Sequence, residues 1–161
     1  LRWATGNLKS TGSTNYIWAP SQTEIGYYYA FNKLYNGSTG DPCSKLNTAY
    51  YGTGWRTPSN NELEKLSRCT DKVFTNNGMW FMNKSLGVFL KAGGVRQESG
   101  AGTGGAGYTD HGCYWTSTIG TSKNAYNMEF WNTEAHVNNT SSWFGLQTHG
   151  LLIRCVKGTK Q

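Results

Sequence analysis

Four widely spaced cysteines constrain the fold of this chain more than any other feature of its sequence. They stand at Cys43, Cys69, Cys113 and Cys155, and no two of them are close neighbours. Structural zinc sites usually bring cysteines in closely spaced pairs, so this spacing argues against such a site. An even number of distant cysteines is instead typical of disulfides formed in an oxidising compartment. The spacing predicts two disulfides and leaves their connectivity open.

The composition indicates a folded, loop-rich domain with a preference for strands. Of the 161 residues, 14% are aromatic and only 15% are charged. Such a chain is too aromatic and too weakly charged to be disordered. Its length fits a single domain, residues 1–161, with its own hydrophobic core, and no apolar run is long enough for a transmembrane segment. Because no signal peptide precedes Leu1, we expect this domain to be part of a longer surface protein.

The net charge of +6 invites a nucleic-acid interpretation, which the distribution of the charges argues against. The lysines and arginines are spread singly from Arg2 to Lys160. Phosphate backbones are bound by positive charge that is clustered along one surface. A solvated surface with scattered lysines is the better interpretation, and we expect no nucleic-acid partner.

Helix signals are concentrated in the second quarter of the chain. Asp41-Pro42 is typical of a helix start, with the aspartate as the cap, and this first helix would end before Gly52. Ser59-Asn60-Asn61-Glu62 is a capping box, which predicts a second helix over about residues 60–69. The sequence therefore predicts two short helices.

Aromatic runs and alternating patterns predict strands in the rest of the chain. The expected strands cover residues 2–5, 16–18, 26–31, 80–82, 87–96, 113–118, 125–131 and 151–156, with a glycine-rich loop at 99–107. In the strand 125–131, Tyr126, Met128 and Phe130 should face the core. Asn127 and Glu129 should face away from it. Strands followed by two helices and then antiparallel strands indicate an α+β fold.

The motifs of the chain argue against catalysis and against a bound cofactor. GTGGAG at 102–107 matches a dinucleotide-binding pattern, but no helix pattern follows it. Cys113 and His149 could be a nucleophile and its base, yet the residues after Cys113 lack the helix that would activate the thiol. The three histidines and nine acidic residues are too scattered for a metal site or paired acids. We expect a non-enzymatic chain with no cofactor and no metal.

The stretch from Asn124 to His149 is the richest candidate for recognition. It combines flat aromatic rings with amides, which bind sugars and protein surfaces by stacking and hydrogen bonding. The candidate ligand-binding residues are Asn127, Glu129, Trp131, Asn132, Asn138, Asn139, Trp143, Phe144 and Gln147. The alternative is that Trp143 and Phe144 only complete the core. We favour a binding face because the polar residues occupy the non-core side of the expected strand.

Short blocks along the chain occur in an order that resembles a known family. They are YYAF (28–31), DPC (41–43), GWRTPSxxEL (54–63), YWTST (114–118), NAY (124–126) and IRCV (153–156). Together they span nearly the whole chain and resemble the Fibrobacter succinogenes major paralogous domain, a module of bacterial surface proteins. Thr57 stands where that family more usually has leucine. The family is similar to C-type-lectin-like domains, to the formylglycine-generating enzymes and to the variable proteins of diversity-generating retroelements.

The resemblance implies a C-type-lectin-like fold with two helices, a small twisted antiparallel sheet and long loops. It implies that Trp55-Arg56 ends the first helix region, and that residues 153–156 form the last strand, beside the N-terminal one. It also implies the two disulfides Cys43–Cys155 and Cys69–Cys113. Calcium-dependent lectins carry Glu-Pro-Asn or Gln-Pro-Asp together with Trp-Asn-Asp, whereas this chain has only Trp131-Asn132-Thr133. We therefore expect no calcium requirement.

The sequence predicts an extracellular domain, displayed on a cell or virion surface, that binds a protein or glycan through its C-terminal face. The asparagine-rich segment 124–147 would suit a retroelement-diversified variable protein. One alternative is a non-binding structural module of a pilus or adhesin. Another is a catalyst of the formylglycine-generating kind. An enzyme needs a convergent cluster of titratable groups, whereas a binder needs an exposed aromatic and amide face.

Overall fold

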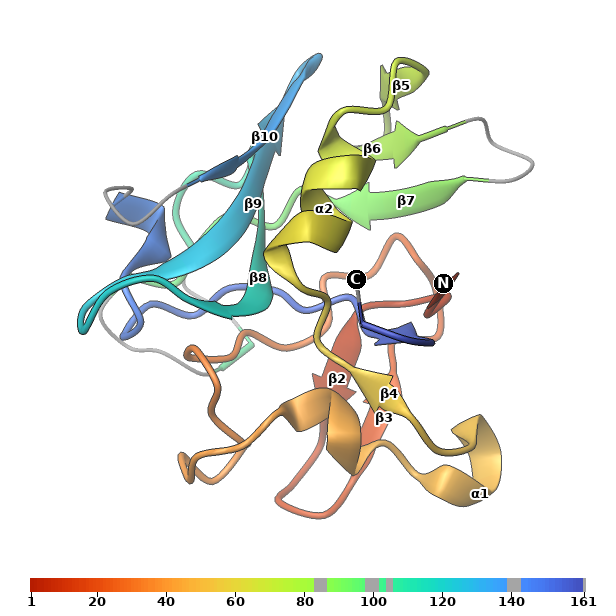
Figure 1. Cartoon of the computed structure of the whole chain (residues 1–161), viewed down its shortest axis with the longest axis vertical. Coiled ribbons are helices and arrows are strands. Elements are labelled where there is room, and N and C mark those ends of the chain that lie inside the picture. Colours follow the sequence, from red (N-terminus) through yellow and green to blue (C-terminus); the bar gives the residue numbers. More distant parts are fainter. Residues whose placement is uncertain (83–86, 98–101, 104–105, 139–142, 161) are drawn as a thin grey trace.

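The computed structural model describes residues 1–82, 87–97, 102–103, 106–138 and 143–160, and it shows an α+β chain (Figure 1). The described helices are α1 (Thr48–Tyr51) and α2 (Asn60–Ser67), with 3-10 turns η1 (Pro42–Lys45) and η2 (Trp143–Gly145). The strands form small antiparallel sheets. In spatial order these are β1 (Arg2–Trp3), β11 (Val156–Lys157) and β4 (Trp55–Arg56); β10 (Glu134–Asn138), β9 (Ala125–Trp131) and β8 (Gly112–Ile119); β2 (Leu8–Ser10) and β3 (Tyr16–Trp18); and β5 (Lys72–Phe74), β6 (Gly78–Phe81) and β7 (Val88–Lys91).

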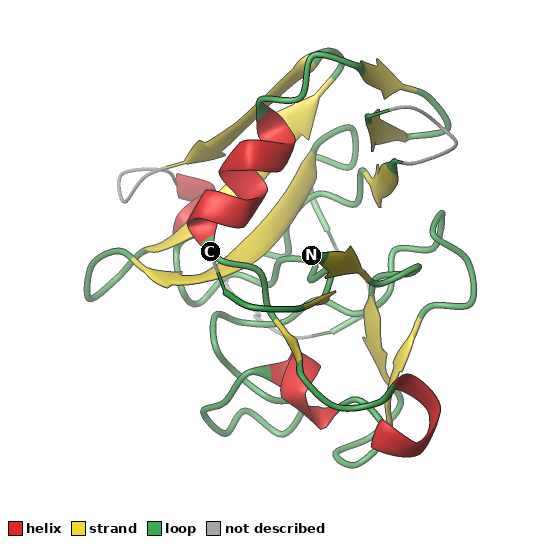
Figure 2. Cartoon of the chain, turned by 45° about the vertical axis from the view of Figure 1, so that its right-hand side comes forward, coloured by secondary structure: helices red, strands yellow, loops and turns green. Residues whose placement is uncertain are grey.

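Helix α2 forms as its capping box predicts. The Ser59 hydroxyl accepts from the Glu62 amide at 3.2 Å, and the Glu62 carboxylate accepts from the Ser59 amide at 2.8 Å. These bonds satisfy amide groups that the first helical turn cannot pair internally. The helix buries Leu63 and Leu66 and crosses the sheet β10-β9-β8 (Figure 2). The second predicted helix is therefore confirmed, two residues shorter than expected at its C-terminal end.

The first predicted helix is broken into two short pieces. Asp41 caps η1 by accepting from the Cys43 amide at 2.9 Å, with proline directly after it, as predicted. A new cap, Asn47, then begins α1, and Gly52 in the left-handed region (φ 73°) ends it. Trp55-Arg56 follow this first helix region and lead into α2, as the resemblance implied. These residues form strand β4, which pairs with β11.

Several predicted strands are confirmed, and four others were not predicted. Strand β11 pairs with β1 at the N-terminus, as the resemblance implied, but it covers residues 156–157 rather than 153–156. Residues 28–29 and 151–152 form isolated bridges rather than continuous strands. Strands β2, β4, β5 and β10 were not predicted from the sequence. The glycine-rich loop at 99–107 lies largely outside the described residues.

The sheet β10-β9-β8 separates two apolar clusters. On one face, Tyr114, Met128 and Phe130 pack in a cluster that includes the leucines of α2. On the other face, Cys113 and Trp115 belong to a second cluster built on the N-terminal half and residues 151–155. Successive side chains of a strand point to opposite faces, so both faces of this sheet are covered.

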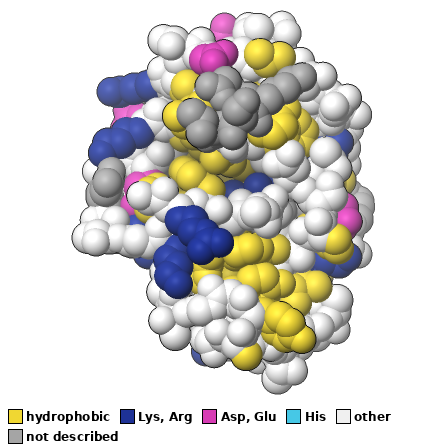
Figure 3. All heavy atoms as spheres, turned by 90° about the vertical axis from the view of Figure 1, so that its right-hand side faces the viewer, with side chains coloured by type: hydrophobic (Ala, Val, Ile, Leu, Met, Phe, Trp, Pro, Cys, Tyr) yellow, Lys and Arg dark blue, Asp and Glu magenta, His cyan; other side chains and the backbone are white. Residues whose placement is uncertain are grey.

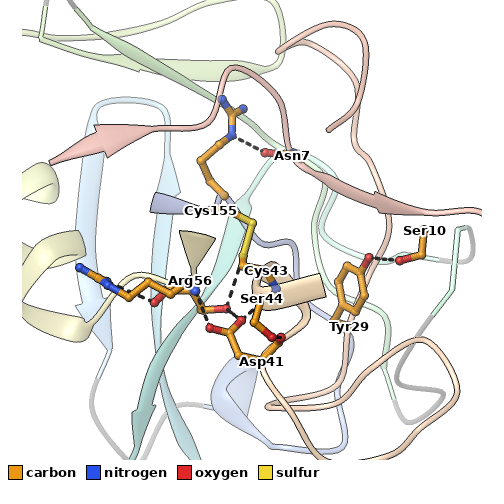
Figure 4. The surroundings of a disulfide bond; sticks show 10 residues. Asn7, Ser10, Tyr29, Asp41, Cys43, Ser44, Arg56 and Cys155 are labelled. Atoms are coloured by element: carbon orange, nitrogen blue, oxygen red, sulfur yellow. Dashed lines mark hydrogen bonds between the residues drawn. A yellow bond between two sulfur atoms is a disulfide. The ribbon is translucent and has the colours of Figure 1, made fainter. Parts of the chain in front are cut away.

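One disulfide joins η1 to the segment before β11. Cys43 and Cys155 are bonded, with their Cα atoms 5.7 Å apart (Figure 4). Next to this bond, the buried Arg154 guanidinium donates to Asn7 Oδ1 at 2.9 Å and to the carbonyls of Ala4 and Phe89. These contacts tie the two ends of the chain together, because Asn7 and Ala4 follow β1 and Arg154 precedes β11.

The predicted second disulfide, Cys69–Cys113, is not formed, and both thiols are free. Cys113 is fully buried on the face of β8 that carries Trp115. Cys69 follows α2, which packs on the opposite face. The sheet therefore lies between the two cysteines, and the expectation was wrong because it took no account of the direction of Cys113 in its strand.

Within the described part of the chain, no helix is long and apolar enough to cross a membrane. On the face beside β7 and the N-terminus, hydrophobic side chains lie next to lysines and arginines, and the described residues visible there include no histidine (Figure 3). The histidines and acids considered next lie around β8, β9 and β10, on the other side in Figure 1.

Candidate functional site

One face of the sheet β10-β9-β8 gathers most of the described polar residues that the sequence singled out. Across the strands, Glu129 is paired with Cys113 and His136, and Asn127 is paired with Trp115 and Asn138. Asn127 and Glu129 do lie on the face opposite Met128 and Phe130, but they are 0% and 6% exposed. The expectation that this face is open to solvent was therefore wrong, because η2 and the second apolar cluster cover it.

The Glu129 carboxylate is the polar centre of this face. Its Oε2 atom accepts a hydrogen bond from Asn138 Nδ2 at 2.7 Å. The Nε2 atoms of His111 and His136 lie 3.9 Å from Oε1 and 3.8 Å from Oε2. These distances are too long for hydrogen bonds, so each histidine adds an electrostatic attraction only when it is protonated. The carboxylate is thus nearly enclosed and accepts a single hydrogen bond within the described residues.

Aromatic rings form the rim around this carboxylate. The His111 ring lies between Trp131 and Phe144, with centroid distances of 5.1 and 6.1 Å. Trp131 also meets His136 edge to face at 5.2 Å, and Tyr108 meets Phe144 in the same way at 5.3 Å. We call this set the Glu129 cluster; it comprises Tyr108, His111, Glu129, Trp131, His136, Asn138 and Phe144.

Tyr108 is the most exposed aromatic residue of the Glu129 cluster. Its side chain is 51% exposed, and its backbone has a φ of 56°, in the left-handed region that non-glycine residues seldom adopt. Such a conformation costs on the order of 1 kcal/mol and persists where the surrounding structure imposes it. An exposed ring on a strained backbone is a feature that recurs at binding sites.

Asn127 lies beneath the cluster with an amide that is not paired. Neither its Oδ1 nor its Nδ2 has a hydrogen-bond partner in the described part of the chain. A methyl group added to Gly145 of η2 would stand 3.0 Å from Asn127 Oδ1, so this amide is packed directly under η2. Burying an unpaired amide costs about 1–3 kcal/mol, and native proteins keep few such groups.

The surroundings of Asp110 and Cys113 shift the pKa values of both groups. The hydrogen bond with His111, whose Nδ1 lies 3.0 Å from the carboxylate, lowers the pKa of Asp110. Burial, and next the charge of Glu129, raise the pKa of the Cys113 thiol well above its usual value. A thiol with a raised pKa stays protonated, and the thiolate is the reactive form. Cys113 is therefore poorly suited to act as a nucleophile.

The remaining predicted residues do not join the Glu129 cluster. Asn132 lies in the exposed turn between β9 and β10, with a φ of 47°. Gln147 lies elsewhere, in a hollow of about 420 Å³ between Phe31 and Leu146, where its amide donates to the Thr121 carbonyl at 2.8 Å. Asn139 lies outside the described residues, as does the side chain of Trp143.

Three members of the cluster were missed in the sequence: Tyr108, His111 and His136. His136 could have been found through the register of the hairpin. If Asn132-Thr133 is read as a two-residue turn, the strand after it is antiparallel to β9, and position 136 falls opposite Glu129. No comparable signal marks Tyr108 or His111, which reach the site from the loop before β8.

Among the described residues, no group of three or more histidine, cysteine, aspartate or glutamate side chains is arranged to hold a metal ion. No protein family model matches the chain. No curated protein matches it significantly in sequence, and no solved structure matches it significantly in fold.

Proposed function

We propose that this chain is a C-type-lectin-like binding domain, displayed outside the cell, that recognises a protein or glycan partner through the Glu129 cluster. The observation that carries the proposal is the combination of half-exposed aromatic rings with a shielded, under-bonded carboxylate and amide. Aromatic residues beside polar groups dominate the energetics of recognition surfaces. The ring of Trp131 is central because it contacts both histidines that flank Glu129.

The disulfide supports an extracellular location. Disulfides persist in oxidising compartments and are rare in the cytosol, and Cys43–Cys155 joins segments 112 residues apart. The lectin-like assignment rests on the ordered sequence blocks, and the α+β architecture with β11 beside β1 agrees with it. Diversification of the segment 124–147 by a retroelement belongs to the same proposal, since β9, β10 and η2 build most of the candidate surface.

The two alternatives make different demands on the molecule. A purely structural module of a pilus or adhesin would leave the Glu129 cluster without a partner, and substitutions there would change stability alone. A catalyst of the formylglycine-generating kind would need two cysteines near each other. Cys69 and Cys113 lie on opposite sides of the sheet β10-β9-β8, so that alternative draws no support from the free thiols.

Binding should be tested on glycan and protein arrays with the intact chain and with Trp131→Ala. We expect the substitution to weaken binding to any array ligand by about 1–4 kcal/mol, as at a hot spot. Trp80→Ala is the matched control, because Trp80 is also half-buried but lies on β6, in another sheet. The control should keep full affinity.

The result that contradicts the proposal is equally clear. If Trp131→Ala binds every array ligand as well as the unmodified chain, the Glu129 cluster is not the recognition surface. If the unmodified chain binds nothing on either array and Trp131→Ala only loses stability, the structural-module alternative is preferred.

A further inference from the structure

We infer that the Glu129 cluster receives a cationic side chain, best an arginine, from a protein partner. This inference rests on the proposed function and narrows its ligand from protein or glycan to a basic segment of protein. It is supported by the hydrogen bonds that Glu129 makes and lacks, by the rings around it, and by a second unpaired polar group on the same face.

The first step is the bonding capacity of Glu129. An ionised carboxylate can accept about four hydrogen bonds, and the described residues supply one, from Asn138 at 2.7 Å. The Glu129 side chain is only 8% exposed, so solvent compensates little of the remainder. A shielded carboxylate costs several kcal/mol unless it is paired. Oε1, which accepts no hydrogen bond from the described residues, is therefore the atom at which a donor with positive charge would be most favourable.

The second step is the aromatic lining. Cations are attracted to the faces of aromatic rings within about 6 Å of the ring centre. This chain already shows such contacts at another site, where Arg2 and Lys157 lie 5.8 and 6.0 Å from the centre of a Trp55 ring. Among the described residues, no lysine or arginine lies in this way over Trp131. Its ring contacts instead the imidazoles beside Glu129.

The third step is Asn127, which is independent of the carboxylate. Its amide is fully buried and unpaired within the described residues, and it lies on the same face of β9 as Glu129, two residues before it. Its cross-strand neighbour, Asn138, is the residue that donates to Glu129. The buried amide lies under η2, so a ligand does not reach it, but it is a second polar group on this face whose bonding the fold leaves incomplete.

The fourth step is the choice of arginine and of a protein. A guanidinium carries five donors in a plane, so it can bond a carboxylate while it stacks on an aromatic ring. An ammonium bonds as a compact point charge. Neutral sugars offer hydroxyl donors without charge, so they would leave the Glu129 charge uncompensated. Asp110 and Glu134, which lie at the ends of β8 and β10, add further negative charge to this side of a chain whose net charge is +6.

The test uses four blocked peptides that differ at one position, which is arginine, lysine, citrulline or glutamate. Each peptide is titrated into the chain, and binding is followed by tryptophan fluorescence and by the NMR resonances of the backbone amides and tryptophan indoles. Citrulline keeps the shape of arginine without its charge. We expect the order arginine, lysine, citrulline, glutamate, with the resonance of the Trp131 indole shifted by arginine. Glu129→Gln should weaken the arginine peptide about tenfold or more, because the charge-assisted bond is lost. Glu64→Gln, at a carboxylate of α2 that is 40% exposed and lies on the other side of the sheet, is the control.

Equal binding of arginine and citrulline peptides, no binding of any arginine peptide, or full arginine affinity in Glu129→Gln would each overturn the inference. The array experiment distinguishes failure of the arginine inference from failure of the proposed function. If Trp131→Ala abolishes binding to a glycan while Glu129→Gln does not, the cluster is a recognition surface for a neutral sugar, and only the cationic assignment is wrong.

Discussion

Glu62 and Glu129 are shielded almost equally, at 2% and 6% exposure, yet the chain surrounds them in opposite ways. The Glu62 carboxylate accepts hydrogen bonds from Nη1 and Nη2 of Arg56, at 2.7 and 2.6 Å, and from the Ser59 amide at 2.8 Å. Glu129 accepts only from Asn138 within the described residues, and its histidine neighbours stand beyond hydrogen-bond distance. One carboxylate is fully bonded and the other is left partly unbonded.

The difference indicates which carboxylate stabilises the fold and which is suited to another role. The Glu62 region also holds Asp41, which accepts from the amides of Cys43 and Thr57 and from the Thr57 hydroxyl, next to the disulfide (Figure 4). Its bonds fix the junction of η1, β4 and α2. In the Glu129 region, the rigid strands hold polar groups whose bonding is incomplete, as expected of a preformed binding surface.

The largest expected effect on stability comes from the disulfide next to the Glu62 region. Replacing Cys43 and Cys155 together by alanine should lower the free energy of unfolding by about 4–5 kcal/mol, since the bond closes a long loop. Urea unfolding measures the change. Cys69→Ala is the control and should alter stability far less, because its thiol is free. In the single-disulfide structure, a thiol reagent should modify Cys69 in the native chain and Cys113 after unfolding without reduction. If neither cysteine reacts, the single-disulfide structure is contradicted.

The second prediction compares the two carboxylates directly. Glu62→Gln should cost about 3 kcal/mol, because it leaves the Arg56 guanidinium without its charge partner and weakens the α2 cap. Glu129→Gln should be neutral or slightly stabilising, since it removes a shielded charge that the fold does not pair. Both changes are read from urea midpoints at neutral pH. Equal destabilisation by the two variants would show that Glu129 serves the fold as Glu62 does.

The third prediction tests the face of the sheet β10-β9-β8 that is opposite Glu129, where the polar groups are well bonded. Burial raises the pKa of Tyr114 to about 12, and its hydroxyl donates to the Lys91 carbonyl at 2.9 Å. A group whose folded pKa is raised contributes stability that is complete below its unfolded pKa of 10.0 and is lost as pH rises toward 12. We expect a loss of about 2–3 kcal/mol from Tyr114 over this window.

Other buried groups act in the same window, so the measurement needs a variant. Burial also raises the pKa of Tyr28 to about 12 and raises that of Tyr29. It lowers the pKa of Arg154 to about 10, which opposes the tyrosines because deprotonation of that arginine favours the folded state. Urea unfolding at a series of pH values should show a net fall above pH 10. Tyr114→Phe should make that fall shallower; an unchanged slope would contradict the assignment.

Local signals predicted the well-bonded Glu62 region better than they predicted the partly unbonded Glu129 region. The Ser59–Glu62 capping box and the Asp41 cap each depend on a few neighbouring residues, so the sequence alone predicted both. The bond Cys43–Cys155 came from the family resemblance, because spacing left the connectivity open. What failed depended on distant packing. Alternation placed Asn127 and Glu129 on the correct face of β9, but only the position of η2 decides that this face is covered.

Two further failures have the same cause. The pairing of Cys69 with Cys113 failed because a sheet lies between them, and a chain pattern contains no information about which side of a sheet a helix will cover. His111 and Tyr108 were missed because they reach Glu129 from a loop. Contacts of that kind arise from tertiary packing and have no periodic signature.

The smallest expected effect concerns Asn127, and it separates stability from binding most cleanly. Replacing its unpaired amide by a side chain of similar size, Asn127→Leu, should raise the free energy of unfolding by about 1 kcal/mol, because a buried polar group without partners is removed. The same variant should leave the affinity for an array ligand nearly unchanged, because the Asn127 amide is fully buried beneath η2. Asn7→Leu is the contrasting control: Asn7 accepts from Arg154 and donates to the Ile25 carbonyl, so its replacement should destabilise the chain. If Asn127→Leu destabilises the chain as strongly as Asn7→Leu, the Asn127 amide is bonded in solution, and the unsatisfied character of the Glu129 face would have to be abandoned.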